Sequence, residues 1–245
     1  MTTASPPIRI VHSSDLHVDD GYTQRAWGGD GNAPLAAVLD AARSANADLV
    51  LLTGDVFEHN RLDAAVLERT AELLAGAGRP VVMLPGNHDP LTDDSVWYRG
   101  GFVGIANVRV LGAGSDSATF EELDLAVWGR AHVDYDDMTP LADPSPRLAG
   151  RHIAVAHGHF VETRPAPGRP GPAWLITADD IEATGADYVA LGHWNVRTKV
   201  GTGTVPAFYS GSPDYARSAN LVVCGNNGVR VSALKVAANT TRVGP

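Results

Sequence analysis

The sequence of 245 residues has one cysteine, two lysines and no long apolar run. A single cysteine, Cys224, excludes an internal disulfide framework and fits a reducing cytoplasm. No stretch approaches the roughly 20 apolar residues that a membrane-spanning helix needs. The polar start, Met1 to Pro7, lacks the basic and apolar parts of a signal peptide. We therefore expect a cytoplasmic protein that does not enter a membrane, with Cys224 buried in a strand.

The chain is also short of positive charge. It has 19 Lys and Arg against 28 Asp and Glu, a net charge of −9. This argues against a broad basic surface for gripping duplex DNA. It does not exclude a nucleic-acid substrate, because bound metal cations can supply positive potential where a phosphate sits. With 44% hydrophobic and 19% charged residues, the composition predicts one globular domain over residues 1–245.

Against these absences stand five short polar clusters, most of which follow an apolar run typical of a β-strand. They are Asp15-Leu16-His17, Gly54-Asp55, Gly86-Asn87-His88-Asp89, His157-Gly158-His159 and Gly192-His193-Trp194-Asn195. Carboxylate and carboxamide oxygens together with imidazole nitrogens are ligands for divalent metals. Any one cluster would be weak support. All five in this order make a two-metal site that cleaves phosphoesters the leading hypothesis.

The first third of the chain predicts alternating strands and helices. Apolar runs over residues 8–12, 49–52 and 80–84 are typical of strands. Residues 34–46 and 62–75 have apolar side chains at helical spacing. Strand, helix, strand, helix, strand indicates βαβ units around a parallel sheet.

The rest of the chain predicts short strands, with one helix at 178–183 that Thr177 caps. The expected strands are residues 108–111, 120–122, 123–129, 153–156, 188–191, 205–209, 221–224 and 229–234. The last three read as a meander, with Gly225-Asn226-Asn227-Gly228 as the turn between the final two. The fold class we expect is α/β, a β-sheet sandwich flanked by helices in four layers.

Each cluster offers definite chemistry. Asp15 and His17 point the same way if their strand continues, so one metal can take both. Asp55 has two oxygens and could bridge two metals. In the third cluster Asn87 offers a neutral oxygen ligand, and His88 could protonate a leaving oxygen or stabilise charge on phosphate. Asp89 could fix the tautomer of His88 from behind.

These residues resemble the calcineurin-like metallophosphoesterase superfamily. Its pattern is Asp-x-His, Gly-Asp, Gly-Asn-His-Asp/Glu, a later His after a strand, then Gly-His-x-His. The match runs from Asp15 to Asn195. Residues 10–17, 187–193 and 208–213 are further similar to the SbcD/Mre11 branch of DNA repair exonucleases. This resemblance implies a phosphodiesterase acting on a nucleotide or nucleic acid.

The resemblance also implies a ligand set. Asp15 and His17 would bind metal 1, Asp55 would bridge, and three residues would bind metal 2, namely Asn87, His157 and His193. His157 is preferred to His159 because it comes first after its strand. Manganese is the expected pair, with iron, zinc or nickel as alternatives, since ligand type alone does not choose. By the same resemblance, a hydroxide between the metals would attack phosphorus in line, the cations would stabilise the charge, and His88 would assist the leaving oxygen.

Three departures from the family pattern matter. Asn195 stands where a histidine would bind metal 1, so it is either a ligand through its carbonyl oxygen or a bystander beside a water. Glu58 stands where the nuclease branch often has His or Asp. The sequence ends soon after Leu234, whereas the nuclease subunits continue into a capping domain and a segment that docks on an ATPase. We therefore expect no capping domain and no ATPase partner.

Two other functions stay open at this point. The first is a phosphomonoesterase or small-molecule phosphodiesterase that uses the same site. The second is a non-catalytic binding module with an eroded metal 1 site, for which Asn195 is the support. Four aromatic residues could stack a base or could simply pack. They are Trp97, Tyr98, Trp174 and Trp194.

Overall fold

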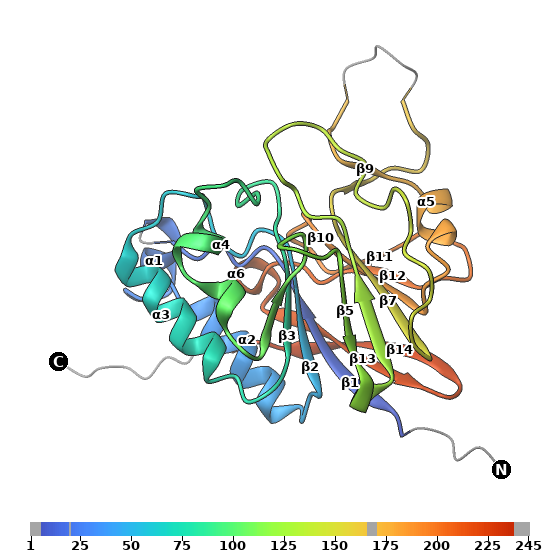
Figure 1. Cartoon of the computed structure of the whole chain (residues 1–245), viewed down its shortest axis with the longest axis horizontal. Helices are drawn as coiled ribbons and strands as arrows, with labels where there is room; N and C mark the ends of the chain where they lie inside the picture. Colours follow the sequence, from blue (N-terminus) through green and yellow to red (C-terminus); the bar gives the residue numbers. More distant parts are fainter. Residues whose placement is uncertain (1–5, 20, 166–170, 238–245) are drawn as a thin grey trace.

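The computed structural model describes residues 6–19, 21–165 and 171–237. Two six-stranded sheets lie face to face, with helices on the outer side of each (Figure 1). This is the expected sandwich of sheets flanked by helices. In the described part of the chain, no helix is both long enough and apolar enough to cross a membrane.

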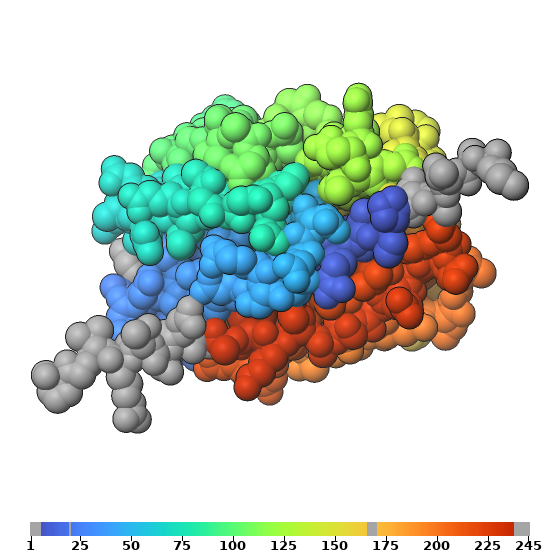
Figure 2. All heavy atoms as spheres, turned by 90° about the horizontal axis from the view of Figure 1, so that it is seen from below, coloured from blue at the N-terminus to red at the C-terminus, as the bar shows by residue number. Residues whose placement is uncertain are grey.

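The first sheet has the strand order β14-β13-β1-β2-β3-β4. Its strands are β1 (Ile8–Ser13), β2 (Leu49–Thr53), β3 (Val81–Leu84), β4 (Val108–Val110), β13 (Ser218–Gly225) and β14 (Gly228–Lys235). β1 to β4 are parallel, and the hairpin β13–β14 joins β1 antiparallel. Figure 2 shows this hairpin, in red, lying along the blue N-terminal strand.

The second sheet has the order β11-β12-β10-β7-β6-β5. Its strands are β5 (Ser117–Phe120), β6 (Leu125–Trp128), β7 (Arg151–His157), β10 (Tyr188–Gly192), β11 (Thr198–Val200) and β12 (Ala207–Tyr209). The four central strands are parallel, and β5 and β11 are antiparallel edges. A separate parallel pair forms from β8 (His159–Phe160) and β9 (Leu175–Ile176).

Helices cover the outer faces of this sandwich. They are α1 (Tyr22–Ala26), α2 (Ala33–Ser44), α3 (Ala64–Ala75), α4 (Val96–Arg99), α5 (Ala178–Ala183) and α6 (Pro213–Ala216), with 3₁₀ turns η1 (Phe102–Gly104) and η2 (Glu121–Leu123). α5 begins at Thr177, whose hydroxyl accepts from the Asp180 N–H in a capping box. Thr177 is therefore the N-cap that the sequence predicts.

Alternation along β2 shows how the layers are filled. Val50 and Leu52 face outward into a buried cluster with residues of α2 and α3. Leu49 and Leu51 face inward and pack in the core between the two sheets. Because successive side chains of a strand point to opposite faces, a continuous apolar run is what a strand buried on both sides requires.

The structure corrects two sequence predictions. The strand expected at residues 120–122 is the end of β5 followed by η2. The expected C-terminal meander is split: β13 and β14 form the predicted hairpin, but β12 belongs to the other sheet. The turn residues set the hairpin, whereas the sheet that β12 joins depends on long-range packing. Cys224 is buried at 3% exposure, as expected.

Candidate metal centre and active site

The five polar clusters meet at one edge of the sandwich. The loops after β1, β2 and β3 carry Asp15, Asp55 and Asn87. His157 is the last residue of β7, and His193 directly follows β10. Because these strands are parallel within each sheet, their carboxyl ends face the same edge, where α/β folds place their sites.

Four of these residues have an unusual backbone. Asp15, His17, Asp55 and His193 have φ angles of 53°, 48°, 50° and 109°. The first strand therefore does not continue through Asp15 and His17, contrary to the sequence argument. Instead the Asp15 N–H donates to the Gly54 carbonyl and the His17 N–H to the Asp55 carbonyl, both at 3.1 Å. These bonds hold the loops after β1 and β2 together.

One group of ligand atoms gathers around His157. Its Nε2 lies 3.1 Å from Asp55 Oδ2 and 3.0 Å from Asn87 Oδ1. His193 Nδ1 lies 3.2 Å from the same Asn87 oxygen. The Nδ1 of His157 donates to the Thr53 carbonyl at 2.9 Å, which leaves Nε2 to face the oxygens. The four residues that the resemblance implied for metal 2 are thus side by side.

A second group combines Asp15, His17 and Asp55, with one ligand atom of each within 4.8 Å of the others. The Asp15 carboxylate accepts from the Ser14 hydroxyl and from the His193 N–H. Asn195, which stands where the family has a histidine, is exposed. Its backbone carbonyl accepts from the Ser212 N–H, and its side chain makes no hydrogen bond seen within the described ranges.

The carboxylate beside His17 belongs to Glu58. Its Oε2 lies 2.8 Å from His17 Nδ1, and its Oε1 lies 3.6 Å from His88 Nδ1. These three residues form a third group of closely spaced ligand atoms. From the sequence alone, Glu58 is visible only as a departure from the family pattern. The available signal was a carboxylate three residues after Asp55 on the same loop.

Asp89 was expected to fix the tautomer of His88, but its hydrogen-bond partners are backbone groups. Both Asp89 oxygens accept from backbone N–H groups, those of Phe57 at 3.0 Å and Gly86 at 2.6 Å. Asp89 therefore braces the loops after β2 and β3. The Nδ1 of His88 instead lies 3.1 Å from the Glu58 backbone carbonyl. Since a carbonyl oxygen can only accept, Nδ1 is the donor. This leaves Nε2 of a ring that is 40% exposed available to a substrate.

Another buried histidine supports His157 from behind and was not predicted. His132 follows β6, is 1% exposed and donates from Nε2 to the His157 carbonyl at 2.9 Å. Burial and the nearby His157 lower its pKa to about 4. A neutral His132 adds no positive charge near the ligands.

Charge in the cluster is unevenly distributed. Burial alone would lower the pKa of His157, but the Asp55 carboxylate raises it to about 9. Burial and the nearby His157 lower the pKa of His193 to about 4. The Glu58 carboxylate raises the pKa of His88 to about 9, and His17 and His88 lower the pKa of Glu58 to about 2.

These residues fit divalent metal ions. Asp15 and Asp55 are both 2% exposed, and burial raises the pKa of Asp15. Two buried carboxylates this close call for a positive charge between them. The buried Nδ1 of His17 has no aligned hydrogen-bond partner in the described structure, even though Glu58 is near. The donors are oxygens and imidazoles, as the resemblance implied.

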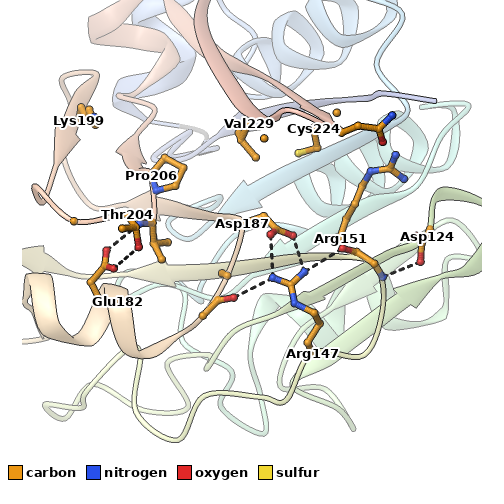
Figure 3. Close-up of a pocket in the computed structure, with 18 residues that line it drawn as sticks. Asp124, Arg147, Arg151, Glu182, Asp187, Lys199, Thr204, Pro206, Cys224 and Val229 are labelled. Atoms are coloured by element: carbon orange, nitrogen blue, oxygen red, sulfur yellow. Dashed lines mark hydrogen bonds and ion pairs between the residues drawn. The ribbon is translucent and has the colours of Figure 1, made fainter. Parts of the chain in front are cut away.

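A cavity of about 900 Å³ lies elsewhere, by the amino ends of β7 and β10 (Figure 3). Several of its polar groups are already hydrogen-bonded within the protein. Arg147 forms two bonds to Asp187, at 2.8 and 2.9 Å, and Glu182 accepts from Thr204 at 2.7 Å. We assign no chemistry to this cavity.

The four aromatic residues divide by location. Trp97 is fully buried against Phe57, with ring centroids 5.2 Å apart, and is a core residue. Trp194 stacks on Tyr209 at 4.3 Å. Trp174 lies 5.8 Å from the His193 ring, centroid to centroid. Tyr98 is 46% exposed on α4.

The fold and the clustered ligands are those of a metal-dependent phosphoesterase. The family model described as "Calcineurin-like phosphoesterase" matches residues 8–225. The chain belongs to this family of metal-dependent hydrolases, whose members typically use two metal ions. The superfamily expectation is confirmed.

One curated sequence is similar to this chain, and two solved structures share its fold. The chain is 27% identical over 232 residues to "Uncharacterized metallophosphoesterase YhaO" of Bacillus subtilis (strain 168); the match covers 84% of the chain and 53% of the relative. The chain thus spans about half the length of that relative. The protein TT1561 of Thermus thermophilus has a similar fold, with a TM-score of 0.60 and 12% identity. The match covers 93% of this chain and 99% of that one. A Staphylococcus aureus structure named "Putative 5'-Nucleotidase" also has a similar fold, with a TM-score of 0.63 and 13% identity. The match covers 98% of this chain and 56% of that one.

Proposed function

We propose that this protein is a two-metal phosphodiesterase that acts on a nucleotide or nucleic acid, like the SbcD/Mre11 branch. The observation that carries the proposal is the placement of His88. Its ring borders both Glu58 and the ligand groups, and its Nε2 is available at an exposed edge. An ester of phosphate with an alcohol needs such a proton donor because alkoxide is a poor leaving group.

We further infer the ligand assignment. Asp15 and His17 would hold metal 1, Asp55 would contribute to both sites, and Asn87, His157 and His193 would hold metal 2. Manganese is the expected ion. Asn195 is the candidate to complete metal 1, because it stands where the family has a histidine. The Glu58 carboxylate, 2.8 Å from His17 and 3.6 Å from His88, would instead favour the protonated form of His88. The described chain would then act as one phosphoesterase domain.

Bound divalent cations would stabilise negative charge on the phosphate and activate water. The chain's own residues do the rest. His88 donates a proton from Nε2 to the leaving oxygen, and its Nδ1 stays anchored on the Glu58 carbonyl. Asp89 keeps the loop that carries His88 in place through two backbone bonds.

A substrate panel tests the proposal. Purified protein with Mn²⁺ is assayed on bis-p-nitrophenyl phosphate, p-nitrophenyl phosphate and single-stranded DNA. We expect diester turnover that exceeds monoester turnover. Turnover of the monoester alone would contradict the proposal and favour the phosphomonoesterase. Metal binding without turnover of any substrate would favour the non-catalytic module.

A variant tests the role of His88. We expect His88→Ala to lose about 10²- to 10⁴-fold in turnover of a diester with an alcohol leaving group, the usual contribution of a general acid. Metal content, measured by elemental analysis, should stay near that of the parent protein, since His88 is outside the assigned ligand set. Near-normal turnover would refute the role.

A further inference from the structure

A cavity of about 610 Å³ opens directly beside the proposed acid. Asn87 and His88 line one side of it, and Asn60 and Tyr135 line it elsewhere. Because His88 protonates the leaving oxygen in the proposed reaction, a group attached to that oxygen would enter this cavity. Its volume lies in the range of small-molecule sites, about 300–1,000 Å³.

The wall of the cavity is fixed in place. Asn60 is 9% exposed, donates from Nδ2 to the Pro90 carbonyl at 2.8 Å and accepts from the Val96 N–H at 3.1 Å. The same Nδ2 lies 3.5 Å from the Tyr135 hydroxyl. Tyr135 is nevertheless 61% exposed. An exposed aromatic ring tethered at its hydroxyl offers a flat face to a ligand at low cost in conformational entropy.

The charges of the lining point to a neutral ligand group. Glu58 and Asp94 are acidic, and they are balanced by Arg61 and by His88, the proposed acid, so the described lining has no surplus of positive charge. This balance does not favour a second phosphate. Carboxylates and an amide suit the hydroxyls of a sugar and the amino groups of a base. An aromatic face with these polar groups suits a nucleoside.

We propose that this cavity binds the nucleoside carried on the leaving oxygen, with Tyr135 as the stacking platform for its base. The inference rests on the proposed function and deepens it. It names the substrate as a diester whose leaving group is a nucleoside, and Tyr135 as a residue that determines specificity. Trp174 lies near His193, on the metal 2 side, and is not part of this cavity's lining.

Adenosine binding tests this inference without any turnover. Titration of the metal-free protein with adenosine, followed by ligand-observed NMR, should give saturable binding, and ribose should bind far more weakly because it has no base. Tyr135→Ala should weaken adenosine binding about 5- to 100-fold, the usual effect of removing a stacking partner. Tyr135→Phe should retain most of the affinity, because the ring is kept.

A matched control is Tyr22→Ala, since Tyr22 is 67% exposed on α1 and does not line the cavity. It should bind adenosine like the parent protein. Adenosine that binds no better than ribose, or equal affinity in Tyr135→Ala and its parent, would overturn the inference. Neither result would contradict the proposal that the protein hydrolyses diesters. An inactive protein that still binds adenosine through Tyr135 would refute only the proposed function.

Discussion

Replacing Glu58 with glutamine should change the pH dependence of catalysis rather than abolish it. The Glu58 carboxylate is the main reason that the pKa of His88 is raised to about 9. An acid must be protonated to act. At pH 8 a group with that pKa is about nine-tenths protonated, whereas one at the ordinary value of about 6.5 is about 3% protonated.

Full loss of the Glu58 effect would therefore lower the rate at pH 8 about thirtyfold. Glu58 is 38% exposed, and solvent screens part of its interaction, so we expect about tenfold. At pH 6 the loss should be small, because His88 is mostly protonated with either pKa. The alkaline limb of the rate profile should thus move to lower pH in Glu58→Gln.

The assay compares two substrates across pH 5.5 to 9.5 with saturating Mn²⁺. A dinucleoside monophosphate has an alkoxide leaving group that needs the proton. Bis-p-nitrophenyl phosphate releases nitrophenolate, which leaves without one, so it serves as an internal control. Glu68→Gln, an exposed change on α3, is the matched control variant. An equal loss at pH 6 and pH 8, or on both substrates, would refute the reasoning.

Three other changes have clear expected outcomes. Asn195→His should tighten the weaker of two Mn²⁺ sites in a calorimetric titration, since imidazole is the better ligand, and unchanged affinity would make position 195 a bystander. Gly54→Ala would bring a Cβ within 2.0 Å of His157 Nδ1 at a φ of +88°, so Mn²⁺ affinity should fall at least about tenfold; parent-like affinity would show that the loop yields. Phe57→Ala should lower the free energy of unfolding by about 3–5 kcal/mol in urea, and a loss under about 1 kcal/mol would contradict its packing.

Much of this site could be predicted from the sequence because strand ends are visible there. The apolar runs before Asp15, Asp55 and Asn87 indicate parallel strands, and parallel strands bring their carboxyl ends together. The contacts of Asp89 and Glu58 were missed for a different reason. Which of two nearby carboxylates reaches His88 depends on how two loops cross, and spacing along the chain does not record that.

The strand β12 shows the same limit at the level of the fold. Its apolar run resembles those of β13 and β14, yet it pairs with β10 and β11 in the other sheet. A turn such as that at Asn226 and Asn227 specifies its own hairpin. Which of the two sheets β12 joins depends on which sheet has an unpaired edge strand. That depends on contacts between residues far apart in the sequence.

The left-handed backbone at Asp15, His17, Asp55 and His193 has a consequence for engineering. Residues held in this region typically cost about 1–3 kcal/mol each, and glycine would relieve that cost at any of the four positions. Selection for thermal stability alone would thus tend to replace the residues on which the metal centre depends. A screen for a more thermostable variant should therefore leave these four positions unchanged. Without that restriction, its most stable variant would be a well-folded protein without catalytic activity.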